Sequence, residues 1–313
     1  MDTLSGFLDG PRAHGAFLLK TVLEVPFALS IEDEAPLTIV VLLRGAAWIG
    51  TGPTGTQLSA GDVVLVRGPD HYLFADEPAS PVQVRILPGQ ECVSLTGQSM
   101  AEVMGLGVRT WGHRADATTA ALIGTYEGVS EVGRRLTAVL PALVVLRAEE
   151  WESAVLDLLE AECARQGPGQ QTVLDRLLDL LVIDAVRAWF ARPDTAVPPW
   201  YAAGGDAVVE QALQLLHDDH ARPWTVESLA AAVGVSRAAL ARRFTLALGE
   251  PPMTYLTGWR LALAADLLQD PEATVGRVAR EVGYGSGFAL SAAFKRAYGC
   301  SPRDYRSSVR RTA

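Results

Sequence analysis

The stretch Val226-Glu-Ser-Leu-Ala-Ala-Ala-Val-Gly-Val-Ser236 recurs further along the chain as Val275-Gly-Arg-Val-Ala-Arg-Glu-Val-Gly-Tyr-Gly-Ser286. The aliphatic positions and the glycine recur 49 residues later, whereas the serine and the apolar residues after it recur 50 residues later. One inserted residue in the turn accounts for the change of spacing. The pairs at the longer spacing are Ser236 and Ser286, Leu240 and Leu290, and Phe244 and Phe294.

Each copy of this repeat predicts the same pair of helices. An amphipathic helix ends at a glycine, Gly234 or Gly283, which can adopt the left-handed conformation that closes a helix. After a short turn, Ser236 or Ser286 can cap the N-terminus of a second helix. This is the pattern of a helix-turn-helix motif, and two matched copies are much stronger evidence than one helical hairpin.

We expect the second helix of each copy to place its N-terminal face in the major groove of DNA, with the two copies reaching grooves about 34 Å apart. A single arginine on such a helix more often contacts phosphate than a base, and the paired architecture raises Arg237 and Arg242 above that expectation. The candidate DNA-binding residues are Ser236, Arg237, Ala238, Ala241 and Arg242 in the first copy, and Ser286, Gly287, Phe288, Ser291, Lys295 and Arg296 in the second.

Charge is unevenly distributed along the 313 residues. The formal net charge of −9, taken whole, argues against a nucleic-acid partner. Residues 1–203, however, carry 14 basic and 25 acidic side chains, whereas residues 204–313 carry 13 and 11. Residues 235–313 carry 12 and 6, a net of +6. The basic surplus therefore coincides with the repeat.

The remaining composition indicates a cytoplasmic protein. The three cysteines, Cys92, Cys163 and Cys300, are far apart and lack metal-like spacing, as expected in a reducing compartment. The N-terminal residues do not resemble a signal peptide, and no stretch of 18 apolar residues predicts a membrane span. We expect no membrane partner.

The length predicts two domains. Short apolar strands separated by Gly, Pro and Asp clusters continue to about residue 126 and indicate a sandwich or small barrel. A helical pattern follows over residues 130–192, in which the apolar helix 170–190 packs in the core or forms a dimer interface. Residues 193–205, rich in Pro and Gly, are the predicted linker, and residues 206–313 read as helical throughout.

Residues 206–313 resemble the DNA-binding domain of bacterial AraC/XylS-family transcription regulators. The resemblance implies two helix-turn-helix units joined by a central helix at about Met253 to Gln269, and RNA polymerase as a partner if the protein is an activator. The matching runs include Trp224-Thr-Val-Glu-Ser-Leu-Ala, Gly249-Glu-Pro-Pro-Met-Thr-Tyr255, Ala279-Arg-Glu-Val-Gly-Tyr284 and Ala293-Phe-Lys-Arg-Ala-Tyr-Gly-Cys300-Ser-Pro302.

The second copy departs from the family pattern at one position. The family usually has Ser-Arg-Ala-Phe-Lys where this chain has Ser291-Ala-Ala-Phe-Lys295. A missing bidentate donor removes roughly 1–3 kcal/mol of discrimination at one base pair. Our hypothesis is that the first copy carries most of the base readout, while the second contacts phosphates and Phe288 is a candidate for contact with a thymine methyl.

The run from Gly61-Asp62 through His71 to Asp76 resembles the second half-motif of cupin barrels. The resemblance implies an α+β chain, with a cupin-like sensor barrel and helical extension in residues 1–192 and an all-α domain in residues 206–313. Cupin enzymes bind metal through several His and a Glu, whereas Pro36 to Val40, where a His-x-His should fall, contains no histidine. We therefore expect no metal, no cofactor and no enzymatic activity. The candidate ligand-binding residues are Trp48, His71 and Tyr72.

Taken together, the sequence predicts a sequence-specific regulator of transcription that binds double-stranded DNA and responds to an unidentified small molecule at the barrel. One alternative is a ligand-independent homodimeric regulator whose barrel only dimerises. Another is a metal-dependent cupin enzyme with a DNA-binding tail.

Overall fold

The computed structural model describes residues 17–51, 54–126, 131–151, 153–163, 165–195, 197–198 and 206–312. These residues form two compact units. One contains residues 17–126 and 137–195, and the other combines residues 131–136 with residues 206–312. Most of the predicted linker at 193–205 lies outside the described residues.

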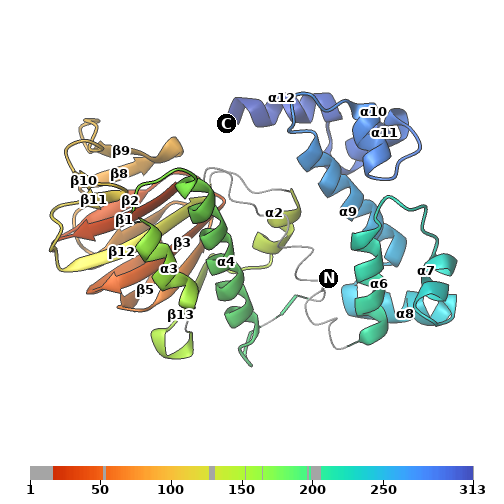
Figure 1. The fold of residues 1–313 in the computed structure, drawn as a ribbon, viewed down its shortest axis with the longest axis horizontal. Coiled ribbons are helices and arrows are strands. Elements are labelled where there is room, and N and C mark those ends of the chain that lie inside the picture. Colours follow the sequence, from red (N-terminus) through yellow and green to blue (C-terminus); the bar gives the residue numbers. More distant parts are fainter. Residues whose placement is uncertain are drawn as a thin grey trace. The chain divides into compact units, whose positions relative to one another are not determined.

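Two sheets make up the first unit (Figure 1). A core of aliphatic and aromatic side chains from both sheets packs between them. This architecture confirms the β-rich N-terminal region predicted from the short strands. In spatial order, the seven-stranded sheet contains β10 (Gly105–Gly107), β11 (Thr110–Gly112), β1 (Phe17–Leu23), β12 (Thr119–Tyr126), β3 (Leu37–Arg44), β6 (Val63–Arg67) and β13 (Leu143–Leu146), and the six-stranded sheet contains β5 (Thr54–Ser59), β4 (Ala46–Thr51), β7 (Tyr72–Ala75), β2 (Ala28–Ile31), β8 (Val84–Leu87) and β9 (Glu91–Ser94).

Strand β13 corrects the expectation that the chain is helical from residue 130 onward. It pairs antiparallel with β6, so that Leu143 lies opposite Val66 and Leu146 opposite Val63. Pro141 disfavours continuation of a helix, and the two β-branched residues of β13, which contains only four residues, fit a pleated and half-buried surface. The strand completes the edge of the seven-stranded sheet.

Helices α3 (Ala154–Cys163) and α4 (Gln170–Phe190) pack together beside this sheet. Leu178 of α4 approaches β12 at Gly124, where an added Cβ would lie only 2.4 Å from the Leu178 Cδ1 atom. The helix therefore buries one apolar face on the sheet, which supports the core-packing interpretation of residues 170–190. The opposite side of the pair exposes Leu158, Val173 and Leu180.

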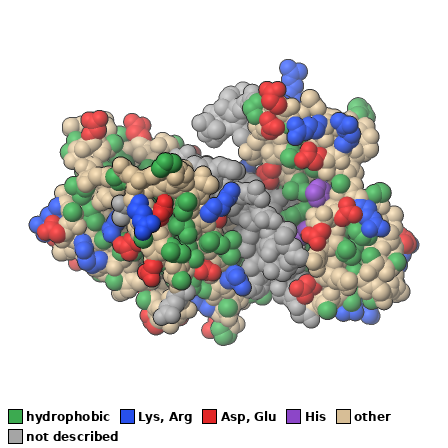
Figure 2. Space-filling model, viewed as in Figure 1, with side chains coloured by type: hydrophobic (Ala, Val, Ile, Leu, Met, Phe, Trp, Pro, Cys, Tyr) green, Lys and Arg blue, Asp and Glu red, His purple; other side chains and the backbone are tan. Residues whose placement is uncertain are grey.

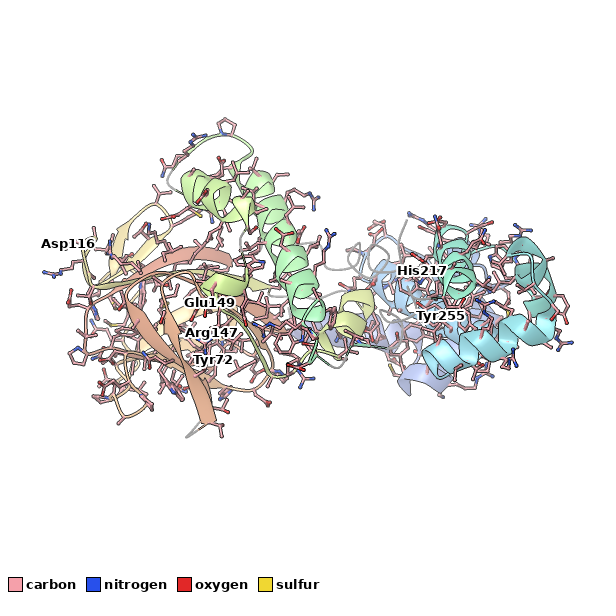
Figure 3. The ribbon with its side chains drawn as sticks, turned by 90° about the horizontal axis from the view of Figure 1, so that it is seen from below. Tyr72, Asp116, Arg147, Glu149, His217 and Tyr255 are labelled. Atoms are coloured by element: carbon pink, nitrogen blue, oxygen red, sulfur yellow. The ribbon has the colours of Figure 1, made fainter. Side chains whose placement is uncertain are left out.

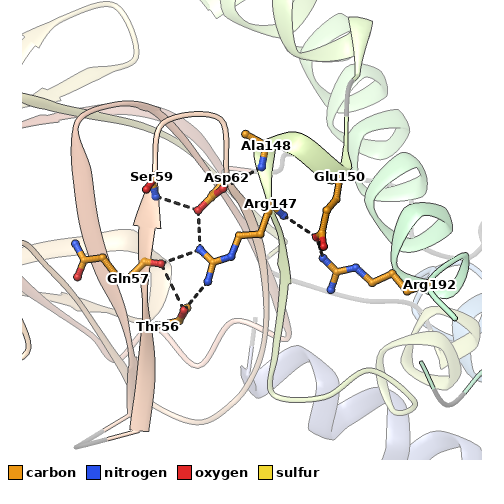
Figure 4. A network of polar contacts seen from close by, with 8 residues as sticks. All are labelled: Thr56, Gln57, Ser59, Asp62, Arg147, Ala148, Glu150 and Arg192. Atoms are coloured by element: carbon orange, nitrogen blue, oxygen red, sulfur yellow. Dashed lines mark hydrogen bonds and ion pairs between the residues drawn. The ribbon is translucent and has the colours of Figure 1, made fainter. Parts of the chain in front are cut away.

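Asp62 of the cupin-like motif has a structural role (Figure 4). The Asp62 carboxylate accepts hydrogen bonds from the Ser59 N–H at 2.9 Å, the Arg147 Nη1 at 2.7 Å and the Ala148 N–H at 3.0 Å. Burial alone would raise the pKa of Asp62, but these hydrogen bonds outweigh it and hold the pKa below its usual value. Asp62 thus fastens the β5–β6 turn to the chain that leaves β13.

Replacing Asp62 with alanine should destabilise the first unit by about 1–3 kcal/mol at pH 7, because three hydrogen-bond donors lose a buried, charged acceptor. Since the folded-state pKa is depressed, this contribution is complete above the unfolded pKa of about 3.9 and disappears as the pH falls through the lower folded-state value. Chemical denaturation at pH 7 and at lower pH measures both effects. Asp116→Ala is the matched control, since that side chain is 81% exposed at the periphery (Figure 3).

Helices form the second unit. Helix α6 (Ala207–Asp218) precedes two hairpins, α7 (Val226–Ala232) with α8 (Arg237–Leu248), and α10 (Val275–Glu281) with α11 (Gly287–Tyr298). Helix α9 (Pro252–Leu267) joins the hairpins, close to the expected range, and α12 (Pro302–Thr312) follows. His217 of α6 contacts α9 through a 2.8 Å hydrogen bond to the Tyr255 hydroxyl (Figure 3).

The short helix α2 (Glu131–Thr137) also contributes to this unit, apart from its last residue. The Glu131 N–H donates to the Asp266 carboxylate at 2.6 Å, and the Tyr305 hydroxyl donates to the Glu131 carboxylate at 3.3 Å. Residues 131–136 therefore lie against α9 and α12, although they were expected to extend the barrel domain.

Candidate nucleic-acid interface

The two turns between paired helices have the same backbone geometry. Gly234 and Gly283 have φ angles of +73° and +81°, in the left-handed region that favours glycine. In each turn the residue after the glycine caps the C-terminus of the first helix. The Val235 N–H donates to the Ala230 carbonyl at 3.0 Å, and the Tyr284 N–H donates to the Ala279 carbonyl at 2.7 Å. The repeat in the sequence therefore corresponds to two copies of one C-terminal helix cap.

Serine begins the second helix of each pair, as predicted. Ser236 Oγ accepts from the Ala239 N–H at 3.2 Å, and Ser286 Oγ accepts from the Ala289 N–H at 3.1 Å. Both hydroxyls thus satisfy backbone donors at the helix N-terminus. Their first role is to fix where α8 and α11 begin, and with it the direction in which each helix presents its first turn.

The apolar anchors of both helices are fully buried. Leu240 and Phe244 of α8, and Leu290 and Phe294 of α11, have essentially no solvent exposure. Phe294 also packs against Tyr298 and Tyr305, with ring centroids 4.4 and 5.3 Å away. Burial of this face leaves the opposite face of each helix open.

The open face of α8 carries two arginines, of which, among the described residues, one is paired with a carboxylate and the other is not. Arg242 is exposed and makes no hydrogen bond or ion pair with any residue that the structure describes. Arg237 is exposed as well, but its Nη1 atom lies 2.8 Å from Glu227 Oε1 on α7. Ala238 is exposed, whereas Ala241 is half-buried and leaves less room for contact than the sequence suggested.

The open face of α11 is less polar. Phe288 in its first turn is 87% exposed. The candidate DNA-binding residues Gly287 and Ser291 are half-buried, and the Ser291 hydroxyl donates to the Gly287 carbonyl at 2.8 Å. Lys295 and Arg296 are exposed in the last turn. Cationic groups on this helix therefore lie far from its N-terminus.

Three arginines of the basic region serve the fold. Arg243 forms a bidentate pair with Asp206, at 2.7 and 2.6 Å, and so joins α8 to the start of α6. Arg260 donates to the carbonyls of His220 and Arg222. Arg306 donates to the carbonyls of Leu268 and Ala273. The sequence predicts Arg242 and not Arg243 as a candidate DNA-binding residue, and the structure pairs Arg243 with Asp206.

A cavity with a volume of about 40 Å³ lies between the two sheets of the first unit. Tyr72 lines it, but Trp48 and His71 do not. Trp48 packs on the β4–β5 hairpin, where an added Cβ at Gly55 would lie 2.2 Å from the indole, and His71 is exposed. Of the three candidate ligand-binding residues, the structure therefore brings only Tyr72 into the cavity.

Within the described parts of the chain, no group of three or more His, Cys, Asp or Glu side chains is arranged to hold a metal ion. Burial raises the pKa of the Cys92 thiol, which lines the cavity, and so opposes thiolate formation there. No helix among the described residues is long and apolar enough to cross a membrane.

Two family models match the chain. The cupin model matches residues 2–191, and the helix-turn-helix domain model matches residues 229–308. A putative AraC-like transcription regulator of Streptomyces antibioticus is 41% identical over 159 residues, which cover 51% of this chain and 52% of the relative, so the chain spans about half the length of that relative. The transcriptional regulator AlkR of Acinetobacter baylyi is 29% identical over 98% of this chain and 99% of its own.

A solved structure of the DNA-binding domain of AdpA in complex with a target DNA is 34% identical to this chain, with a TM-score of 0.32, and covers 34% of this chain and 94% of that domain. The relatives are transcription regulators, not enzymes. Because the cupin model covers more than half of the chain and the helix-turn-helix model covers both hairpins from Leu229 within α7, the chain belongs to the AraC family of DNA-binding transcription regulators with an N-terminal cupin domain.

Proposed function

We propose that this regulator reads a specific operator in double-stranded DNA through the first turns of α8 and α11, and that a small molecule in the cupin domain controls this binding. The observation that carries the proposal is the duplicated hairpin. In both copies the aromatic anchor is buried while the N-terminal face of the second helix stays open. Such a face is the part of a helix-turn-helix that contacts base edges.

The two helix-turn-helix copies contribute unequally to the reading of bases. Arg242 is an exposed guanidinium without a competing partner among the described residues, which suits bidentate contact with guanine. Helix α11 offers Phe288 near its start and Lys295 and Arg296 near its end. An apolar ring suits contact with a thymine methyl, and distant cations suit phosphates. Base readout in the second copy is therefore weaker than in the first.

The ion pair with Glu227 competes with DNA phosphate for the Arg237 guanidinium. We expect Glu227→Gln to strengthen DNA binding by up to about fivefold at low salt, because an exposed pair contributes at most about 1 kcal/mol and its loss frees Arg237 for phosphate. Fluorescence anisotropy over a salt series measures the change. Glu272→Gln removes the same charge from an exposed position without an arginine partner among the described residues, and an equal gain there would show that net charge alone is responsible.

Control by an effector rests on the cavity between the sheets. A ligand shifts the protein between two arrangements only if it binds one of them better. Gel-shift titration with promoter DNA over a salt series, with and without candidate small molecules, tests the whole proposal. Footprinting upstream of the protein's own gene identifies the operator. Binding without sequence preference would contradict operator recognition, and binding that no ligand alters would favour a ligand-independent regulator.

Dimerisation is a further part of the proposal. Figure 2 shows hydrophobic side chains gathered over α3 and α4, where Leu158, Val173 and Leu180 are exposed. Exposed apolar groups on a helix pair suit a second copy of the chain. Sedimentation of the full chain over a concentration series tests this, and a monomer at all concentrations would contradict it.

A further inference from the structure

The walls of the cavity between the sheets are mostly aliphatic and aromatic. Strand alternation turns Phe17, Leu19 and Thr21 of β1 to the cavity, and Ile123 and Thr125 of β12 lie beside them, since Phe17 pairs with Thr125 and Leu19 with Ile123. The six-stranded sheet contributes Leu29, Ile31, Phe74 and Ile86 from the other side. A ligand here would bury an apolar body.

The described residues that line the cavity carry charge of one sign. Among the lining residues that the structure describes, Asp33 alone is charged, and none is a lysine, arginine or histidine. Its carboxylate accepts from Gln90 Nε2 at 2.7 Å and from the Ala35 N–H at 3.2 Å. An anionic ligand would lose its hydration without gaining a counter-charge, and would face this carboxylate.

The remaining polar groups suit a neutral hydroxyl. Thr21 lines the cavity, and its Oγ1 atom is buried without a hydrogen-bond partner in the described part of the chain. A buried hydroxyl without a partner is unfavourable, so a ligand that supplied one would gain affinity. Burial raises the pKa of Tyr72, and the Asp33 carboxylate raises it further, so the phenol stays neutral.

We propose that the cupin cavity takes a short, uncharged, largely apolar molecule with a single hydroxyl group, and that it rejects the carboxylate of the same chain length. The small interior limits the ligand to a few non-hydrogen atoms unless the walls move. The proposal rests on the effector role of this cavity proposed above, and adds the chemical class of the effector.

The selectivity is tested by titrating the full chain, without DNA, with 1-butanol and with butyrate. Saturation-transfer NMR of the ligand measures binding in each titration. We expect butanol to bind at least tenfold more tightly than butyrate. In Asp33→Asn this difference should shrink several-fold, because the repelling charge is gone while the shape is kept. In Thr21→Val butanol should bind several-fold more weakly, although the fold is retained.

A blocking variant places the binding inside the cavity. Ile123→Phe enlarges a half-buried wall residue and should abolish butanol binding. Leu95→Phe makes a comparable change at a side chain that is 64% exposed in the same unit, and should leave binding unchanged. Thermal unfolding of both variants confirms that they fold.

These binding measurements distinguish the proposed ligand class of the cavity from the proposed control of DNA binding by an effector. Butyrate binding as tightly as butanol, or neither ligand binding, overturns the proposed ligand class. Selective butanol binding that Ile123→Phe abolishes supports the class, even if butanol leaves operator affinity unchanged. That last result would contradict effector control and not the chemistry of the cavity.

Discussion

Phe294→Ala is expected to destabilise the second unit by about 3–5 kcal/mol, whereas Phe288→Ala, six residues earlier on the same helix, should leave its stability within about 0.5 kcal/mol of wild type. Phe294 is fully buried and packs against Tyr298 and Tyr305, so its removal leaves a cavity in the cluster that holds α11. Phe288 is 87% exposed and contributes no packing of that kind.

DNA binding should respond in the opposite order at a temperature where both variants remain folded. Phe288→Ala removes the apolar group at the start of α11 and should weaken operator binding severalfold, while folded Phe294→Ala keeps the whole open face. Chemical denaturation followed by circular dichroism, together with anisotropy titrations, measures both properties. Equal stability losses in the two variants would show that Phe288 packs against the protein, and the assignment of the open face would then be wrong.

Both hairpins of the second unit could be predicted from the repeat alone. The spacing of Leu240 and Phe244, repeated in Leu290 and Phe294, fixes which face of each helix is buried, and the glycine and serine between the helices fix the turn. Local chemistry dictates these features, so one sequence is sufficient to find them. The buried anchors and both caps are confirmed.

Features that depend on packing between distant parts of the chain could not be predicted from the sequence. Strand β13 forms because β6 offers it an edge some 80 residues earlier in the chain. Trp48 resembles a pocket aromatic in the sequence, but Gly50 and Gly55 on its own hairpin make room for its ring there. The cavity lining draws on strands from both sheets, and no short motif marks residues such as Thr21 and Asp33 as neighbours. The role of Glu227 beside Arg237 likewise appears only once α7 and α8 are in place.

Arg242→Ala is expected to weaken operator binding by about 5- to 150-fold and to relax preference at one base pair, which corresponds to about 1–3 kcal/mol for a bidentate contact with guanine. Arg242 is the α8 arginine that is exposed and has no partner among the described residues, whereas Arg243 is committed to Asp206 and Arg237 to Glu227. Competition titrations with operators mutated at each position measure both affinity and preference.

The choice of replacement separates base reading from phosphate contact at Arg242. Lysine keeps the charge but lacks the planar fork that pairs with two acceptors of guanine. If Arg242 reads a base, Arg242→Lys should lose preference nearly as fully as Arg242→Ala while keeping the wild-type salt dependence. If Arg242 contacts only phosphate, lysine should restore most of the affinity, and alanine should weaken all sequences alike and lower the salt slope by about one. Since α11 lacks an arginine in the matching part of its face, the second result would leave neither recognition helix with a strong base-reading side chain, and specificity would then have to come from the shape of the DNA.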